Sequence, residues 1–91
     1  MAKLVKTSGE ILEIQPQNKK VFTLEELQAL VGGYIQLLNL PNGERLVCNE
    51  DGLSLELPPN KIVSYLISKQ FGKPTQTFVG DCVFIKPSEI N

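Results

Sequence analysis

Residues 23–57 decide the fold and read TLEELQALVGGYIQLLNLPNGERLVCNEDGLSLEL. A helix is predicted at the start of this stretch, because Thr23 and Glu26 have the spacing of a capping box. Apolar residues then recur at helical spacing, and Gly32 or Gly33 supplies the left-handed residue that commonly ends a helix. We therefore expect a helix from residue 24 to about residue 31, with one side facing a core.

Two glycine turns follow and predict three consecutive antiparallel strands. Asn42-Gly43 and Asp51-Gly52 are dipeptides preferred in two-residue hairpin turns, and such turns set the strand register. The first turn then places Leu38 opposite Val47, and the second makes residues 53–57 a third strand. Because strand side chains alternate between faces, this register sorts them into two sets. The apolar face is expected to carry Ile35, Leu37, Leu46, Cys48, Leu53, Leu55 and Leu57. The other face, here called the mixed surface, is expected to carry Tyr34, Gln36, Leu38, Arg45, Val47, Asn49, Ser54 and Glu56.

The rest of the chain adds three strands and a second helix. Residues 3–6 and 10–14 are expected to be strands, residues 61–71 a helix, and residues 78–85 a final strand that bends near residue 80. The predicted fold class is α+β, a two-layer domain with the element order β-β-α-β-β-β-α-β. Its sheet is mainly antiparallel, and both helices are expected on one face. We expect a single domain over residues 1–91, with the core at about residues 3–86 and a tail at 87–91.

Composition excludes several classes of function. The net charge is -1, so the chain lacks the basic excess of a dedicated duplex-binding protein. The chain has four Phe and two Tyr, which are few for stacking along a single nucleic-acid strand, so a nucleic-acid partner is not expected. No apolar run has membrane-spanning length, and residues 1–12 lack the apolar core of a signal peptide. We expect no membrane partner and a location in the cytoplasm.

The residues of the common catalytic sites are missing. The chain has no histidine, which removes the commonest general base and metal ligand. Cys48 and Cys82 lie far apart in the sequence, lack zinc-ligand spacing, and are expected to be buried thiols, although a disulfide between them stays open. Carboxylate-only catalysis would need convergence of Glu50, Asp51 and Asp81. We predict no enzyme activity, no catalytic residues, no metal and no cofactor.

Asn60 has two interpretations. Asn is a favoured helix N-cap, and a helix is predicted to begin at Lys61. A helix start can also bind an anion through its free backbone N–H groups. The first helix opens with Glu25 and Glu26, which repel an anion, whereas the second has no acid in its first turn. If the protein binds a phosphorylated ligand, Asn60 and Lys61 are therefore the expected contacts.

The mixed surface is the main candidate for binding. Tyr34 could stack on a base, while Gln36 and Asn49 could form hydrogen bonds with its polar edges. Leu38 and Val47 form an apolar pair on the same surface, which is typical of an interface. Edge strands that lack a partner also recruit one. An ordinary solvent-exposed sheet with scattered apolar residues is the simpler interpretation.

Four sequence blocks resemble a small family of unknown function that is carried mainly by bacteriophages, plasmids and mobile regions of bacterial genomes. The blocks are LVGGYI at residues 30–35, NEDG at 49–52, PN at 59–60 and GD at 80–81. They occur in order over roughly residues 20–86, and no match is visible before Val21. The helix after Asn60 is less alanine-rich than the resemblance implies.

The resemblance implies an accessory binding protein of a phage or mobile element. Our first hypothesis is a homo-oligomer that counters bacterial defence by sequestering a nucleotide-like immune signal at a subunit junction. Its ligand-binding residues would be Tyr34, Gln36, Asn49, Asn60 and Lys61. The alternative is a protein-protein interaction module that inhibits a host or defence protein through the interface residues Leu38 and Val47.

Overall fold

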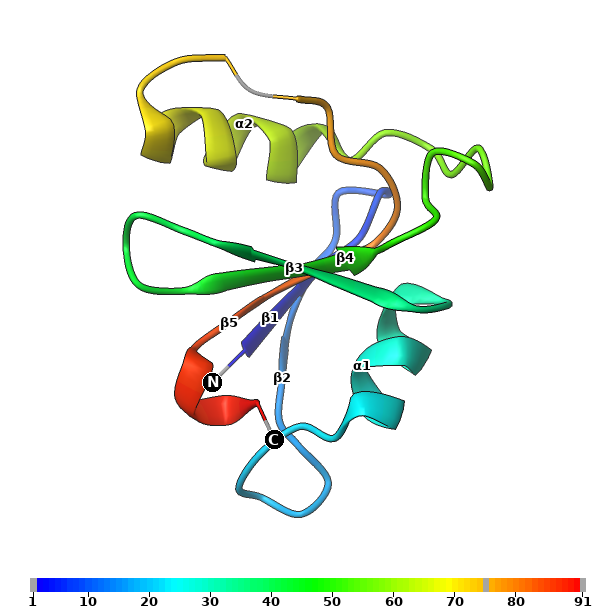
Figure 1. The fold of residues 1–91 in the computed structure, drawn as a ribbon, viewed down its shortest axis with the longest axis vertical. Coiled ribbons are helices and arrows are strands. Elements are labelled where there is room, and N and C mark those ends of the chain that lie inside the picture. Colours follow the sequence, from blue (N-terminus) through cyan, green and yellow to red (C-terminus); the bar gives the residue numbers. More distant parts are fainter. Residues whose placement is uncertain (1, 75, 91) are drawn as a thin grey trace.

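The computed structural model describes residues 2–74 and 76–90, which form an antiparallel sheet and two α-helices (Figure 1). The sheet order is β2-β1-β5-β4-β3, so the C-terminal strand lies between the first strand and the central hairpin. The α+β class with a mainly antiparallel sheet and two helices is confirmed. The elements are β1 (Ala2–Val5), β2 (Ile11–Ile14), α1 (Leu24–Val31), β3 (Ile35–Asn39), β4 (Arg45–Asn49), α2 (Lys61–Phe71), β5 (Cys82–Ile85) and a 3-10 turn, Pro87–Glu89.

The helices lie over opposite faces of the sheet, whereas the sequence led us to expect both on one face. Figure 1 shows α2 above the sheet and α1 below it. The α1-side core contains Ala2, Leu4, Phe22, Leu27, Val31, Val47, Val83 and Ile85. The α2-side core contains Val5, Leu40, Leu46, Cys48, Val63, Ile67, Phe78, Cys82 and Phe84. Strands β4 and β5 are therefore covered on both faces, which explains their unbroken apolar runs.

Both helices begin and end at the predicted residues. Thr23 caps α1: its hydroxyl accepts a hydrogen bond from the N–H of Glu26 at 3.2 Å, and the Glu26 carboxylate accepts one from the N–H of Thr23 at 3.0 Å. The N–H groups of Gln17 and Thr23, both bonded to Glu26, lower the pKa of its carboxyl group. Gly32 and Gly72 end the helices at φ angles of 80° and 70°, in the left-handed region.

The predicted register of the β3–β4 hairpin is wrong by one residue. Leu38 pairs with Leu46, and Val47 pairs with Leu37. The loop has three residues, because the N–H of Leu40 donates to the carbonyl of Glu44 at 2.9 Å and Gly43 alone has a positive φ, 90°. This is the geometry of a type I turn followed by a left-handed residue. Pro41 favours it, because the proline ring fixes φ at a value that suits the first central position of a type I turn.

The predicted third strand at residues 53–57 does not form. Residues 50–56 make successive turns, in which the N–H of Leu55 donates to the carbonyl of Asp51 and the N–H of Leu57 to that of Gly52. The edge of β4 that this strand was expected to occupy is paired with β5. Leu53 and Leu55, which were expected in the core, are instead 78% and 56% exposed.

The segment after β5 is part of the packed structure and not a loose tail. Ile90 forms a bridge with Phe22 and packs partly against the α1-side core. The N–H of Phe22 also donates to the carbonyl of Glu89 at 2.7 Å. The described part of the predicted tail therefore joins the loop that leads into α1.

Candidate functional site

The mixed surface predicted from the sequence does not exist. Leu38 and Val47 point to opposite faces of the sheet, because the true register pairs each of them with a different residue. Val47 is fully buried in the α1-side core, and Leu38 is half-buried against the α2-side core. These two residues therefore cannot form the exposed interface pair that we expected.

Asn49 is buried and joins the end of β4 to the end of α1. Its amide donates to the carbonyl of Val31 at 3.1 Å and accepts from the N–H of Asp51 at 2.8 Å. Gly33 passes so close that an added Cβ atom would lie 2.9 Å from the amide nitrogen of Asn49. The side chain therefore fixes a turn of the fold and is not presented to a ligand.

Asn60 is the N-cap of α2, and its amide is fully used inside the protein. Its oxygen accepts from the N–H of Val63 at 3.1 Å, and its nitrogen donates to the carbonyls of Val5 at 2.9 Å and Gly80 at 3.0 Å. The capping interpretation is confirmed. Lys61 is exposed beside it and lines a depression of about 310 Å³ with Lys6 and residues 7–9.

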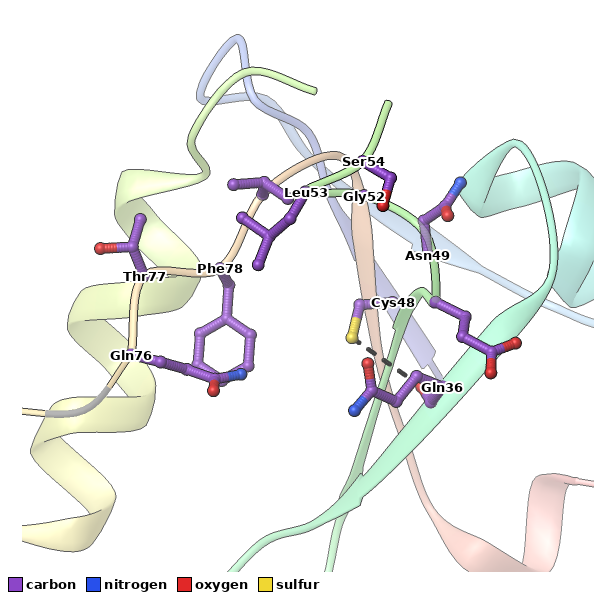
Figure 2. Close-up of a pocket in the computed structure, with 11 residues that line it drawn as sticks. Gln36, Cys48, Asn49, Gly52, Leu53, Ser54, Gln76, Thr77 and Phe78 are labelled. Carbon is purple, nitrogen blue, oxygen red and sulfur yellow. Dashed lines mark hydrogen bonds between the residues drawn. The ribbon is translucent and has the colours of Figure 1, made fainter. Parts of the chain in front are cut away.

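The structure separates the five predicted ligand-binding residues. Asn49 and Asn60 are buried, and the depression beside Lys61 is a different hollow from the one that Gln36 lines. Tyr34 is 67% exposed, immediately before β3, and its backbone carbonyl accepts a hydrogen bond from the N–H of Glu50. Gln36 and Asn49 border one cavity, where the Asn49 side chain points away from the space, towards α1 (Figure 2). Asn60 and Lys61 border the other depression, where the Asn60 amide is already used as the cap of α2.

This cavity, here called the polar cavity, has a volume of about 280 Å³ and lies between the β3–β4 hairpin, the 50–56 turn segment and residues 76–79. Figure 2 shows Gln76 and the Phe78 ring on one side, Cys48 and Gln36 on the other, and Leu53 above. Phe78 and Cys48 also belong to the α2-side core, so the cavity borders the packed interior of the domain.

The chemistry of the polar cavity is that of neutral hydrogen-bonding groups. Amides come from Gln36 and Gln76 and a hydroxyl from Ser54, whereas the Thr77 side chain points away from the space (Figure 2). Among the described residues that line the cavity, the carboxylate is that of Glu50. No Lys or Arg stands among the described residues that line it. Each amide can donate and accept, and each hydroxyl can do both. The site therefore suits a neutral polar molecule and is unfavourable for a phosphate.

Sequence reasoning missed most of this cavity. Residues 76–79 were expected to be a loop and the start of a strand, and no local pattern shows that they lie beside residues 50–54. That neighbourhood arises because β5 inserts between β1 and β4, and Pro59 bridges Val79. Non-local pairing of this kind leaves no periodic signal in the sequence.

Cys48 and Cys82 are both buried free thiols. The register of β4 and β5 pairs Val47 with Val83, so one further step places the two cysteines opposite each other on the same face. Burial raises the pKa of Cys48, and burial together with the neighbouring Cys48 and Asp81 raises the pKa of Cys82 to about 12. Both groups are therefore protonated thiols at neutral pH, which makes them poor nucleophiles.

Comparison with protein-family models gives a match over residues 3–91 to a domain of unknown function, DUF3846. The chain belongs to this family. The match includes the residues before Val21, where no resemblance was visible in the sequence. Searches of curated proteins and of solved structures returned no match to this DUF3846 chain.

In this DUF3846 domain the four sequence blocks meet in pairs at joints, by which we mean contacts where a side chain of one block holds a segment that is distant in the sequence. Asn49 of the NEDG block and Gly33 of the LVGGYI block meet at one joint, as described above. Asn60 of the PN block and Gly80 of the GD block meet at another, where Asp81 also accepts a hydrogen bond from the N–H of Thr7 at 2.9 Å. The polar groups of these blocks are thus largely used in holding the DUF3846 fold together.

Two absences among the described residues, 2–74 and 76–90, bear on the kind of site. Within them, no group of three or more His, Cys, Asp or Glu side chains gathers as a metal site would require. None of their helices combines the length and the apolar character needed to cross a membrane.

Proposed function

We propose that this DUF3846 protein is a non-catalytic binding protein that holds a small neutral ligand in the polar cavity. The observation that carries the proposal is the gathering of amide and hydroxyl side chains from three separate segments around one space of about 280 Å³. That volume is close to the lower end of the roughly 300–1,000 Å³ range of small-molecule sites. The ligand class is therefore a single small molecule rather than an extended chain.

A nucleobase or nucleoside fits the lining groups best. The side-chain amide of Gln36 can donate and accept at once, as the edge of a base requires. The aromatic ring of Phe78 adds an apolar wall. Because Glu50 is the charged residue at the cavity and Lys61 lines a different depression, a phosphorylated nucleotide is disfavoured there. This narrows the nucleotide-like signal of our first hypothesis to its base portion.

Sequestration is the activity that such a site can perform without catalytic groups. A protein that withdraws a signal molecule from its receptor needs affinity alone, and the chain has no histidine to serve as a general base. The resemblance to proteins of phages and mobile elements makes interference with a bacterial defence signal the biological role that we propose. Fold alone does not imply this role, so direct binding must test it.

The test is calorimetric titration with the common nucleosides and, separately, with their 5′-monophosphates. We expect at least one nucleoside to bind, and its monophosphate to bind more weakly. Gln36→Ala should weaken binding by about tenfold or more, which corresponds to about 1.4 kcal/mol. Asn39→Ala is the matched control, because Asn39 is an exposed amide on the same strand but on the opposite face. Absence of binding across the panel, or equal affinities for the two variants, would contradict the proposal.

An alternative function, binding of a host or defence protein, is favoured by one observation. Leu53 and Leu55 project from the 50–56 turn segment with 78% and 56% of their surface exposed. Apolar side chains clustered this way often mark an interaction site. Leu53→Asp should then abolish recovery of one stoichiometric partner from host lysate, and unchanged recovery would count against this surface. A substitution at Val47 cannot test it, because Val47 is in the core.

A further inference from the structure

We propose that the outer edge of β3 pairs antiparallel with β3 of a second copy of this chain, which joins two sheets into one. This inference deepens the proposed function, since it rests on the polar cavity lying at a subunit junction. Its test requires no ligand.

The hydrogen bonds of the hairpin determine which residues of β3 face outwards. The N–H of Leu40 donates to Glu44, and the carbonyl of Tyr34 accepts from Glu50. In an antiparallel pair, hydrogen-bonded and non-bonded positions alternate. The backbone groups of Ile35, Leu37 and Asn39 therefore point away from β4. Within the described residues, β3 is the last strand of the sheet, and no backbone hydrogen bond reaches it from the outer side.

The two edges of the sheet differ in how they discourage pairing. The edge strand β2 carries a charge at Glu13. A charged side chain is a common device that keeps an edge strand from pairing. Residues 34–40, which read YIQLLNL, contain no charge, whereas a proline follows each of the two strands by two residues, Pro16 after β2 and Pro41 after β3. The β3 edge is thus open to another strand, whereas the β2 edge is protected.

The side chains of the β3 edge suit a second copy of the same strand. A two-fold axis through Leu37 pairs this residue with itself and pairs Ile35 with Asn39 of the second copy. Leu37 is 44% exposed, and this pairing covers it with an identical apolar side chain. Because the strand carries no charge, pairing with its own copy brings no like charges together. A partner strand with charged side chains would meet no opposite charge on β3. Such an isologous contact closes on itself as a dimer.

The same pairing places the polar cavities beside the junction. Gln36 lies on the α2 side of the sheet, one residue from the proposed axis, and lines the polar cavity. Because a two-fold axis perpendicular to a continuous sheet keeps equivalent faces on one side, both cavities would open on the same face. A five-residue strand pair is small beside stable interfaces of about 1,200–2,000 Å². We therefore expect dimerisation to depend on protein concentration.

The experiment is sedimentation velocity of the full chain over a concentration series up to about 1 mM, the range in which weak association is visible. The wild-type chain should shift from a species of 10.1 kDa towards one of twice that mass. Leu37→Lys should remain monomeric, because the two-fold axis would set its charge against its own copy. Ile11→Lys on β2 is the matched control, since Ile11 is similarly exposed at 50%, and it should dimerise like the wild type.

A second variant guards against misfolding. Leu37→Pro removes an outward N–H and leaves the inward β3–β4 bonds intact, a position where edge strands tolerate proline. It should keep the wild-type circular dichroism spectrum and be monomeric. A wild-type monomer throughout the series, or loss of dimer in Ile11→Lys alone, would overturn the proposed edge. If a monomeric chain binds nucleosides, the β3 dimer is contradicted and the polar cavity stands as a binding site. If the chain dimerises but binds no nucleoside, the β3 dimer is supported and the proposed function is contradicted.

Discussion

Two amide side chains that were both predicted to contact a ligand, Asn60 and Gln36, have opposite surroundings in the structure. The Asn60 amide is 1% exposed and holds three backbone groups at the start of α2. The Gln36 side chain is exposed at the sheet edge and borders the polar cavity. A polar residue that closes a joint of the fold has little capacity left for a partner. Candidate binding residues are therefore better sought where the side chain borders open space.

The largest expected effect comes from removing the joint at Asn60. Asn60→Ala should lower the free energy of unfolding by about 2–4 kcal/mol, because it removes the acceptor of the Val63 N–H and the amide donor to the carbonyls of Val5 and Gly80. The Gly80 carbonyl keeps a weaker bond from the Cys82 thiol at 3.4 Å. Gln36→Ala removes an amide at the edge and should change stability by no more than about 0.5 kcal/mol. Urea denaturation of the two variants measures the difference. Similar losses in both would show that Asn60 is not the joint described here.

Asn60→Asp separates the two tasks of this side chain. Aspartate keeps an acceptor for the N–H of Val63 and is a good N-cap. It has no donor for the carbonyls of Val5 and Gly80, and it sets a negative charge beside them. We expect a loss comparable to that of Asn60→Ala. Full stability in Asn60→Asp would mean that capping alone is what matters at this position.

A smaller effect is expected from two glycines that share a left-handed conformation. Gly80 and Gly43 have φ angles of 78° and 90°. A Cβ atom at Gly43 meets open space, whereas at Gly80 it would lie 2.8 Å from a methyl carbon of Leu57. Gly43→Ala should cost about 1 kcal/mol for the backbone alone. Gly80→Ala should cost up to about 1 kcal/mol more, because the half-buried Leu57 side chain must leave its preferred rotamer to make room.

Thermal unfolding of the two alanine variants checks this difference. Leu57→Ala in the Gly80→Ala background makes room for the added methyl group, so the double variant should lose less than the sum of the single losses. Strict additivity would indicate that the close approach of Gly80 to Leu57 does not matter for stability. The pair thus compares a glycine at the hairpin tip with one inside the region around Asn60.

Local features of the fold could be predicted from the sequence, and non-local ones could not. The capping box of Thr23 and Glu26 and the left-handed ends at Gly32 and Gly72 involve neighbouring residues, and all are confirmed. The predicted hairpin register is wrong because of Pro41. This residue favours a type I turn, and that preference outweighs the two-residue turn that Asn42-Gly43 favours. Pro41 is therefore the residue that predicts the three-residue loop.

The layer arrangement and the polar cavity both depend on the long-range pairing of β5 with β1 and β4. When β5 pairs with both β1 and β4, it displaces the strand expected at residues 53–57 and brings residues 76–79 beside the hairpin. It also makes β4 a central strand, so that Leu46, Val47 and Cys48 are all buried and need cover on both faces. The three consecutive apolar residues of β4 are the sequence signal for a strand that is buried on both faces. The sequence prediction instead assigned Val47 to a solvent-facing surface, because it assumed that one face of the strand is exposed.

The smallest effect at neutral pH, and a growing one above it, is expected from Cys82 in the α2-side core. Its pKa of about 12 in the folded chain exceeds the ordinary value of 9.0, so the folded chain retains a proton that the unfolded chain releases. The stabilisation from this group is fully present below about pH 9 and is lost as the pH rises towards 12. The slope for one such proton is about 1.4 kcal/mol per pH unit.

Urea denaturation at pH 8, 9 and 10 should therefore show that the free energy of unfolding falls more steeply with pH in the wild type than in Cys82→Ala. Packing lost in the variant shifts its whole curve without changing the slope. Parallel curves would mean that Cys82 is less deeply buried than the register of β4 and β5 requires. The α2-side core would then differ less from the exposed β3 edge than the structure indicates.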